Sequence, residues 1–219
     1  TVEERYRATK TLFQSRTIED LPLTAEQELA YDPIHEALQG NCFAPFLIHG
    51  VTGSGKTQLY MKATKECLEK NKIAIILVPE IMLTNQIVTR FVEAFGDEVV
   101  VFHSKLTISQ RYNNWERLRR KDSHIIIGAR SAVFAPTDDI GLIVVDEEHD
   151  NSYKQEDMVR YHAKQVAYWR AKAHNCPLIL GSATPAITSY YKALQGEYKL
   201  LELPNRIFHQ PLPTVQIVD

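Results

Sequence analysis

The sequence predicts a three-layer α/β fold in which helices flank a mostly parallel central sheet. Short apolar runs alternate with longer amphipathic segments along most of the 219 residues. The apolar runs lack polar alternation, as expected for strands that are buried on both faces of a sheet. Strands that alternate in this way with helices favour a parallel, doubly wound arrangement.

The expected elements follow one another without an internal repeat. The predicted strands are 46–49, 73–78, 99–102, 125–127, 142–145 and 178–180. A first helix begins after Thr24, which forms a capping box with Gln27, and the later helices are 57–69, 84–95, 108–121 and 163–173. We expect residues 1–20 to connect from a preceding domain, residues 21–203 to form the domain, and the proline-containing residues 204–219 to form an exit linker.

Composition excludes several classes of protein. With 44% hydrophobic and 24% charged residues, the chain is neither disordered nor fibrous. The formal net charge of −2 argues against a protein that coats nucleic acid through bulk charge. The apolar runs are far shorter than the roughly 18 residues of a membrane span, so we expect a cytoplasmic protein with no membrane partner. The three scattered cysteines predict neither a disulfide framework nor a zinc site within this chain.

A complete phosphate-binding motif follows the first predicted strand. It reads Gly50-Val51-Thr52-Gly53-Ser54-Gly55-Lys56-Thr57. Glycines allow backbone N–H groups to approach phosphate oxygens, and the helix that follows directs its positive end at the same anion. Lys56 is expected to reach the β- and γ-phosphates, and the Thr57 hydroxyl to ligate Mg²⁺.

An acidic cluster ends the predicted strand 142–145. It reads Asp146-Glu147-Glu148-His149. In a parallel sheet these residues lie at the same edge as the phosphate loop. Asp146 suits direct or second-shell ligation of Mg²⁺, and Glu147 suits positioning and deprotonation of an attacking water. Taken alone, an acidic run of this kind is more often a solvated turn, and His149 an ordinary surface histidine.

Together the motifs resemble those of superfamily 2 helicases, and more closely those of the bacterial primosomal helicases that restart stalled replication forks. The matching segments are 50–57, Val78-Pro79-Glu80-Ile81, 128–136, Asp146–Asp150, Ser152-Tyr153-Lys154-Gln155, Arg160-Tyr161-His162-Ala163 and Gly181-Ser182-Ala183-Thr184-Pro185. The resemblance covers about residues 21–205.

The resemblance implies the first, RecA-like lobe of a DNA helicase that uses ATP and Mg²⁺ to move 3′ to 5′. Residues 204–219 would then lead toward a second lobe, which supplies an arginine finger that this chain lacks, so the chain alone is expected to be nearly inactive. The implied partners are single-stranded and forked DNA, the single-stranded-DNA-binding protein and other primosome proteins. A zinc region is expected only elsewhere in the parent protein.

The resemblance also assigns roles to single residues. Gln27 matches a glutamine that reads adenine, although its capping-box role explains it equally well. His149 belongs to the nucleotide site, and Ser182 and Thr184 match a motif that couples this site to DNA, with a helix N-cap as their alternative. The residues implied to contact DNA or to couple it to the nucleotide are Pro79, Glu80, His103, Ser104, Arg130, Tyr153, Lys154, Arg160, Tyr161 and His162.

Residues 153–162 combine aromatic and basic side chains, which suits single-stranded nucleic acid, although from composition alone this is more typical of a solvated loop.

Three other functions remain open on the sequence. Another superfamily 2 translocase such as a RecG-like enzyme would carry similar motifs. A nucleotide-gated DNA-binding module without motor activity, or a metabolic kinase with the same phosphate loop, would share the loop alone.

Overall fold

The computed structural model describes residues 22–83, 86–157 and 159–207. The expected connector 1–20 and most of the expected exit linker, 208–219, lie outside these residues. Within the described ranges, none of the helices is long and apolar enough to cross a membrane.

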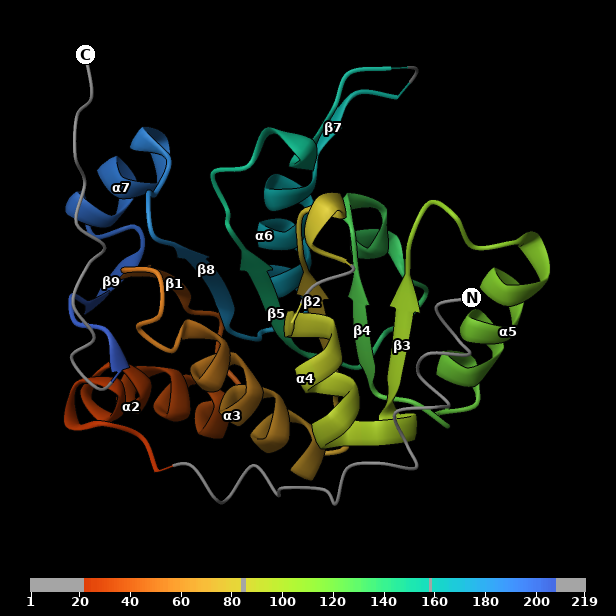
Figure 1. The fold of residues 1–219 in the computed structure, drawn as a ribbon, viewed down its shortest axis with the longest axis horizontal. Coiled ribbons are helices and arrows are strands. Elements are labelled where there is room, and N and C mark those ends of the chain that lie inside the picture. Colours follow the sequence, from red (N-terminus) through yellow and green to blue (C-terminus); the bar gives the residue numbers. More distant parts are fainter. Residues whose placement is uncertain (1–21, 84–85, 158, 208–219) are drawn as a thin grey trace, which may run out of the picture.

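A seven-stranded sheet forms the middle layer (Figure 1). Its strands are β1 (Pro45–Gly50), β2 (Ile73–Leu77), β3 (Val99–Phe102), β4 (Ile125–Gly128), β5 (Ile140–Asp146), β8 (Leu178–Ser182) and β9 (Lys199–Leu203). They lie in the order β3-β4-β2-β5-β8-β1-β9, and every neighbouring pair is parallel. The continuous apolar runs are buried because helices cover both faces of the sheet.

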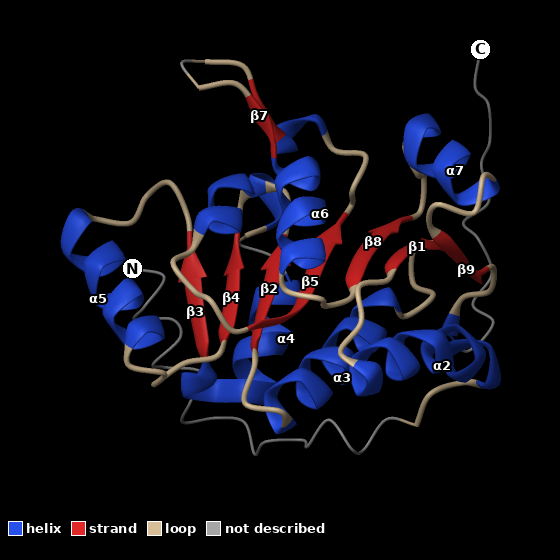
Figure 2. Cartoon of the chain, turned by 180° about the vertical axis from the view of Figure 1, so that it is seen from behind, coloured by secondary structure: helices blue, strands red, loops and turns tan. Residues whose placement is uncertain are grey.

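Helices form the outer two layers (Figures 1 and 2). Helices α2 (Ala25–Gly40), α3 (Lys56–Glu69) and α4 (Gln86–Phe95) contribute to the hydrophobic cluster on one face. Helices α5 (Ile108–Arg119), α6 (Ala163–Ala173) and α7 (Ile187–Leu194) contribute to the cluster on the other face. Short 3-10 turns η2 (Glu80–Met82), η3 (Gly96–Glu98), η4 (Arg130–Phe134) and η5 (Asn151–Tyr153) connect them.

The predicted strands and helices are confirmed to within a few residues at their ends, except that the first two residues of the expected helix 84–95 lie outside the described residues. The structure also adds elements that the sequence analysis missed. Strand β9 is an edge strand whose residues alternate between exposed and buried, so it lacks the continuous apolar run of the inner strands. A two-stranded antiparallel hairpin, β6 (Lys154–Gln155) and β7 (Tyr161–His162), replaces the expected plain loop. The capping box is confirmed: the Thr24 hydroxyl accepts from the Gln27 N–H, and the Gln27 side chain accepts from the Thr24 N–H.

The register of the sheet aligns the ends of its central strands. His49 in β1 pairs with Ser182 in β8, and Gly181 in β8 pairs with Asp146 in β5. The phosphate loop after Gly50 and the acidic cluster after β5 therefore begin at the same level, two strands apart.

A glycine at the end of β4 provides a test of this packing. A Cβ atom at Gly128 would lie 2.6 Å from the Cβ atom of Ala132 and 2.7 Å from the carbonyl oxygen of Phe102. We predict that Gly128→Ala lowers the free energy of unfolding by about 2 to 3 kcal/mol, because the backbone must shift to admit the methyl group. Urea denaturation measures this loss.

Gly40 supplies the matched control, since its added Cβ would lie no closer than 3.6 Å to the Cys42 sulfur. Gly40→Ala should leave stability unchanged or raise it by up to about 1 kcal/mol. Equal stabilities of the two variants would contradict the close packing at Gly128.

Candidate functional site

The phosphate loop joins β1 to α3 and requires its glycines. Gly53 has φ 83° and Gly55 has φ 86°, a left-handed conformation that glycine adopts without strain. A Cβ atom at Gly55 would also lie 2.1 Å from Nε2 of Gln27. The backbone therefore forms a concave cradle that no other residue type would leave open at this position.

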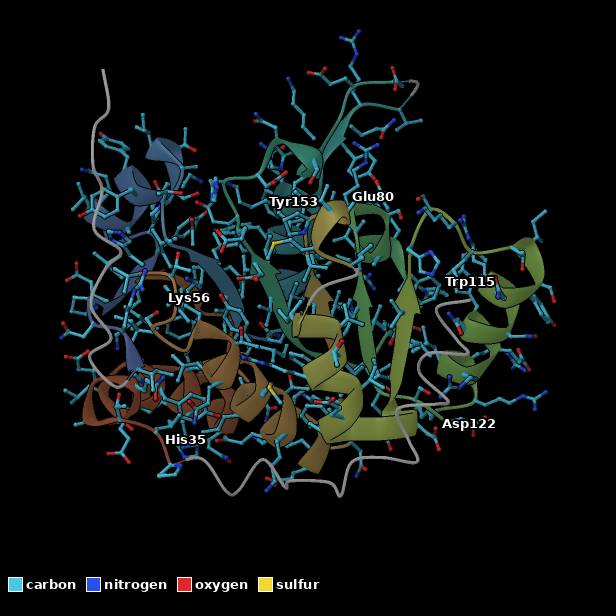
Figure 3. All side chains as sticks on the ribbon, viewed as in Figure 1. His35, Lys56, Glu80, Trp115, Asp122 and Tyr153 are labelled. Atoms are coloured by element: carbon cyan, nitrogen blue, oxygen red, sulfur yellow. The ribbon has the colours of Figure 1, made fainter. Side chains whose placement is uncertain are left out.

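Lys56 lies inside this loop at the first turn of α3 (Figure 3). The residue is 9% exposed, and its Nζ donates to the carbonyl oxygen of Gly50 at 2.7 Å. A buried ammonium group beside a helix N-terminus creates a strongly positive site. The loop is thus suited to a multiply charged anion such as a polyphosphate.

Asp146 ends β5 and is buried opposite the loop. Its Oδ1 accepts from the Tyr60 hydroxyl at 3.0 Å, and the residue is 6% exposed. Burial, and then the charge of Glu147, raises the pKa of Asp146 to about 6, while the Tyr60 hydroxyl and Lys56 oppose this shift. The contact depends on Gly181, because a Cβ atom there would lie 1.7 Å from the Tyr60 hydroxyl oxygen.

Glu147 occupies a strained turn directly after Asp146. Its φ is 44°, which is uncommon for a residue with a side chain and is often found at functional sites. Its side chain is 26% exposed, so the carboxylate is accessible from solvent at the sheet edge that also carries the phosphate loop.

His149 connects the acidic cluster to the end of β8. Its Nδ1 lies 2.7 Å from the Ser182 hydroxyl and 3.6 Å from the Glu147 carboxylate, and its Nε2 lies 3.5 Å from the Thr184 hydroxyl. The alternative N-cap role of Ser182 and Thr184 is wrong, because α7 begins at Ile187 after Ala186. Ser182 instead accepts from the Thr184 N–H and contacts the histidine.

Glu148 is a buried member of the cluster to which the sequence analysis assigned no role. Its side chain is fully buried and forms an ion pair with Lys164 of α6. It also accepts from the Ser189 hydroxyl and from the Ala186 N–H, both at 2.7 Å. One carboxylate thus joins the end of β5 to the first turns of α6 and α7. The partners are 16 to 41 residues away along the chain, so no local pattern indicates them.

The hairpin β6–β7 projects from the sheet edge that carries these acids (Figures 1 and 2). At its base, the Arg130 guanidinium donates to the carbonyl oxygens of Ser152 at 3.4 Å and Lys154 at 2.7 Å. Arg130 therefore anchors the hairpin in this structure. Tyr161 packs edge-to-face on Phe134 with ring centroids 4.9 Å apart.

Tyr153 and His162 are held by the fold at the base of this hairpin. Tyr153 is 0% exposed, and its hydroxyl donates to the Asp146 carbonyl at 2.6 Å. Its ring lies in the core, so the expectation of a direct DNA contact is wrong for Tyr153, and a coupling role remains a proposal. His162 accepts from the Lys164 N–H as the N-cap of α6, and burial lowers its pKa.

The remaining expected DNA contacts lie at the same strand-end edge. Pro79 and Glu80 open η2 after β2, with Glu80 exposed there (Figure 3). His103 and Ser104 follow β3, and the side chains of Lys154 and Arg160 are exposed on the hairpin. Residues 79–80 and 103–104 share this edge because the parallel strands that precede them end there.

A hollow of about 230 Å³ opens beside the phosphate loop. The first turn of α2 forms one side of it, where Gln27 donates from Nε2 to the Ser54 carbonyl at 3.0 Å. Leu203, Asn205, Arg206 and Ile207 line the other side.

Comparison with known proteins identifies the family. Residues 24–193 match the family model described as DEAD/DEAH box helicase. The chain belongs to this family. It is 49% identical to the replication restart protein PriA of Bacillus subtilis over 217 residues. This alignment covers 99% of this chain and 27% of the Bacillus subtilis protein. It is 42% identical to PriA of Treponema pallidum over 204 residues, an alignment that covers 93% of this chain and 31% of the Treponema pallidum protein.

The chain therefore spans about a third or less of the curated relatives that it matches. Among solved structures, RecG bound to a three-way DNA junction matches 93% of this chain and 25% of that chain, with TM-score 0.59 and 21% identity. The helicase domain of Pyrococcus furiosus Hef matches 84% of this chain and 38% of that chain, with TM-score 0.55 and 17% identity. These likenesses confirm the three-layer RecA-like fold expected of a helicase lobe, and the PriA relatives confirm the resemblance carried by the motifs.

The buried Glu148 pair predicts a large stability effect. Glu148→Ala removes the ion-pair partner of Lys164 and leaves the Ser189 hydroxyl and the Ala186 N–H without their acceptor, so we expect the free energy of unfolding to fall by about 3 to 5 kcal/mol. Glu148→Gln keeps some of the hydrogen bonds and should lose less. Chemical denaturation of both variants measures the difference.

Glu156→Ala is the matched control, because the Glu156–Lys154 pair has side chains that are 70% and 61% exposed. Its effect should stay within about 1 kcal/mol. A similarly small loss in Glu148→Ala would contradict the central role of the buried pair.

Proposed function

We propose that this chain is the first, ATP-binding lobe of a DNA helicase that couples ATP hydrolysis to 3′–5′ translocation and restarts stalled replication forks. The observation that carries the proposal is the alignment of the phosphate loop with Asp146 and Glu147 at one sheet edge. The chain's similarity to replication restart proteins over nearly its full length supports the cellular role.

The residues present fit Mg-ATP. The glycine cradle and Lys56 hold the phosphates. The Thr57 hydroxyl and the Asp146 carboxylate supply oxygen ligands of the kind that Mg²⁺ prefers. When bound, Mg²⁺ neutralises charge on the β- and γ-phosphates. A cation at Asp146 would favour its ionised form and offset the effect of burial on its pKa.

Glu147 acts as the general base. Its carboxylate is partly exposed at the sheet edge that carries the phosphate loop, so it can orient a water and accept its proton. His149 lies between the Glu147 carboxylate and Ser182. Its role is to position Glu147, and it is not itself the general base. The contacts from His149 to Ser182 and Thr184 connect the nucleotide site to β8.

The DNA path runs over the same strand-end edge. Single strands are held by a combination of stacking and phosphate contacts, which the hairpin residues Lys154, Arg160 and Tyr161 offer. Arg130 and His162 hold the base of this hairpin and so couple its position to η4 and α6. The other proposed contacts are Pro79, Glu80, His103 and Ser104.

Residues 21–203 form lobe 1 in this proposal, and residues 204–219 lead to a second lobe of a longer protein. That lobe supplies an arginine finger, a group whose absence typically costs about 10³ to 10⁵ in rate. The 219-residue chain should bind Mg-ATP and hydrolyse it slowly. Single-stranded and forked DNA, the single-stranded-DNA-binding protein and other primosome proteins are the partners, in the bacterial cytoplasm, with zinc bound elsewhere in that protein.

Steady-state ATP turnover with and without single-stranded DNA tests the motor assignment. In the full-length protein we expect strong stimulation by DNA, and in the 219-residue chain little turnover in either condition. Nucleotide binding with no DNA-stimulated turnover in the full-length protein would favour a nucleotide-gated module and overturn the helicase proposal.

Lys56→Ala should weaken Mg-ATP binding to the 219-residue chain about a hundredfold or more, because the variant loses a buried, charge-assisted contact to the phosphates. Isothermal titration calorimetry measures the affinity. Lys199→Ala removes an exposed cation at the start of β9, and its affinity should equal that of the unmodified chain. Unchanged binding in Lys56→Ala would exclude the phosphate loop as the site.

Glu147→Gln should keep Mg-ATP affinity and lower kcat of the full-length enzyme by about 10² to 10⁴, because the amide cannot accept the proton of the attacking water. Calorimetry and DNA-stimulated turnover give the two values. A variant that keeps the parental kcat would show that another group is the base.

A further inference from the structure

Residues 204–207 form a strap that folds back over the phosphate loop. Just before it, the Leu203 carbonyl accepts from the Val51 N–H at 3.2 Å, and within it the Ile207 N–H donates to the Gly53 carbonyl at 3.0 Å. Asn205 Nδ2 donates to a Glu26 carboxylate oxygen of α2 at 2.6 Å. The start of the expected exit linker is therefore fixed to both sides of the candidate nucleotide site.

The strap closes one side of the hollow beside the loop. The aliphatic part of Arg206 approaches Gly53, and Ile207 approaches Gly55, where an added Cβ atom would lie 2.7 Å from Ile207 Cδ1. Across the hollow lies the first turn of α2 with Gln27. The space is thus bounded by two elements that are about 180 residues apart in the sequence but adjacent in the fold.

Two polar atoms at this hollow lack partners. Among the buried side-chain nitrogen and oxygen atoms of the described residues, Ser54 Oγ and Arg206 Nε form no hydrogen bond. Ser54 is 3% exposed, and both residues line the hollow. Buried polar groups are nearly always hydrogen-bonded in native proteins, so two exceptions at one cavity point to a polar ligand.

Gln27 restricts which ligand fits. An amide side chain has two N–H donors and two acceptor lone pairs. The structure uses one donor, to the Ser54 carbonyl, and one lone pair, for the Thr24 N–H. The remaining donor and acceptor match N7 and the 6-amino group of adenine, the pairing that glutamine typically makes with this base.

We propose that the strap is the second wall of a purine subsite, with the Arg206 guanidinium packed on the face of the base and Ile207 in apolar contact with it. The inference rests on the proposed function, since it places the base of the same ATP that occupies the phosphate loop. A planar guanidinium stacks on an aromatic ring as an ammonium cannot. Arg206 is therefore a specificity-determining residue that lies outside the conventional phosphate and acidic motifs.

Calorimetry with two ligands separates base contacts from phosphate contacts. We expect Arg206→Ala and Arg206→Lys each to bind Mg-ATP about tenfold more weakly than the unmodified chain and to bind Mg-tripolyphosphate equally well. Arg90→Ala, which removes an exposed arginine from α4, serves as the control and should bind both ligands normally.

Each other outcome overturns the assignment in a recognisable way. Equal losses for ATP and tripolyphosphate would mean that Arg206 contacts phosphate. Unchanged ATP affinity in both Arg206 variants would remove the strap from the subsite and leave the phosphate site intact. An unmodified chain that binds neither ligand would overturn the proposed function, and the inference with it.

A second measurement uses the unmodified chain and does not depend on the folding of a variant. Photolabelling with 8-azido-ATP, followed by trypsin and mass spectrometry, should place label on the peptide 200–206, and excess ATP should prevent it. The proposal would be overturned if the label that excess ATP prevents were found only on peptides that contain neither residues 24–27 nor residues 204–207.

Discussion

The burial of carboxylates at the end of β5 is the constraint around which the rest of this structure is arranged. Asp146 is 6% exposed and Glu148 is 1% exposed, and the two are separated by one residue of the same charge. Buried charges of like sign are costly unless each has partners of its own. The Tyr60 hydroxyl supports Asp146, whereas Lys164 and Ser189 support Glu148. These partners come from α3, α6 and α7, so the acids fix helices on both faces of the sheet.

The two buried carboxylates have different partners, and this separates the proposed catalytic site from the contacts that join the helices. Asp146 accepts a hydrogen bond from α3, while Glu148 contacts the two helices on the opposite face. Between them, Glu147 takes a left-handed conformation with φ 44°, which leaves its carboxylate partly exposed. Strain of this kind persists where neighbouring contacts determine the backbone. The buried acids on either side of Glu147 supply those contacts. Glu147, the most exposed of the three acids, is the one that can reach a water molecule.

The sequence predicted what depends on local pattern. Inner strands were evident because both of their faces are buried, and the phosphate loop because its glycines and Lys56 are contiguous. Edge strand β9 was missed because only one of its faces is covered. Tyr153 was expected at a DNA surface, whereas its hydroxyl reaches the Asp146 carbonyl through the tight turn η5. The partners of Glu148, up to 41 residues away, depend on how the helices pack, and no spacing indicates them.

The capping box of Gln27 is compatible with the proposed role of the same side chain in reading adenine. Its Oε1 closes the capping box and sets where α2 begins, while its Nε2 donates to Ser54 in the phosphate loop. The cap therefore orients the amide toward the loop, since the side chain is 1% exposed and held at both ends. A residue fixed in this way offers its remaining donor and acceptor at little further entropic cost, which favours selective contact with a base. Helix capping and base recognition are thus compatible, because the cap preorganises the amide for the second role.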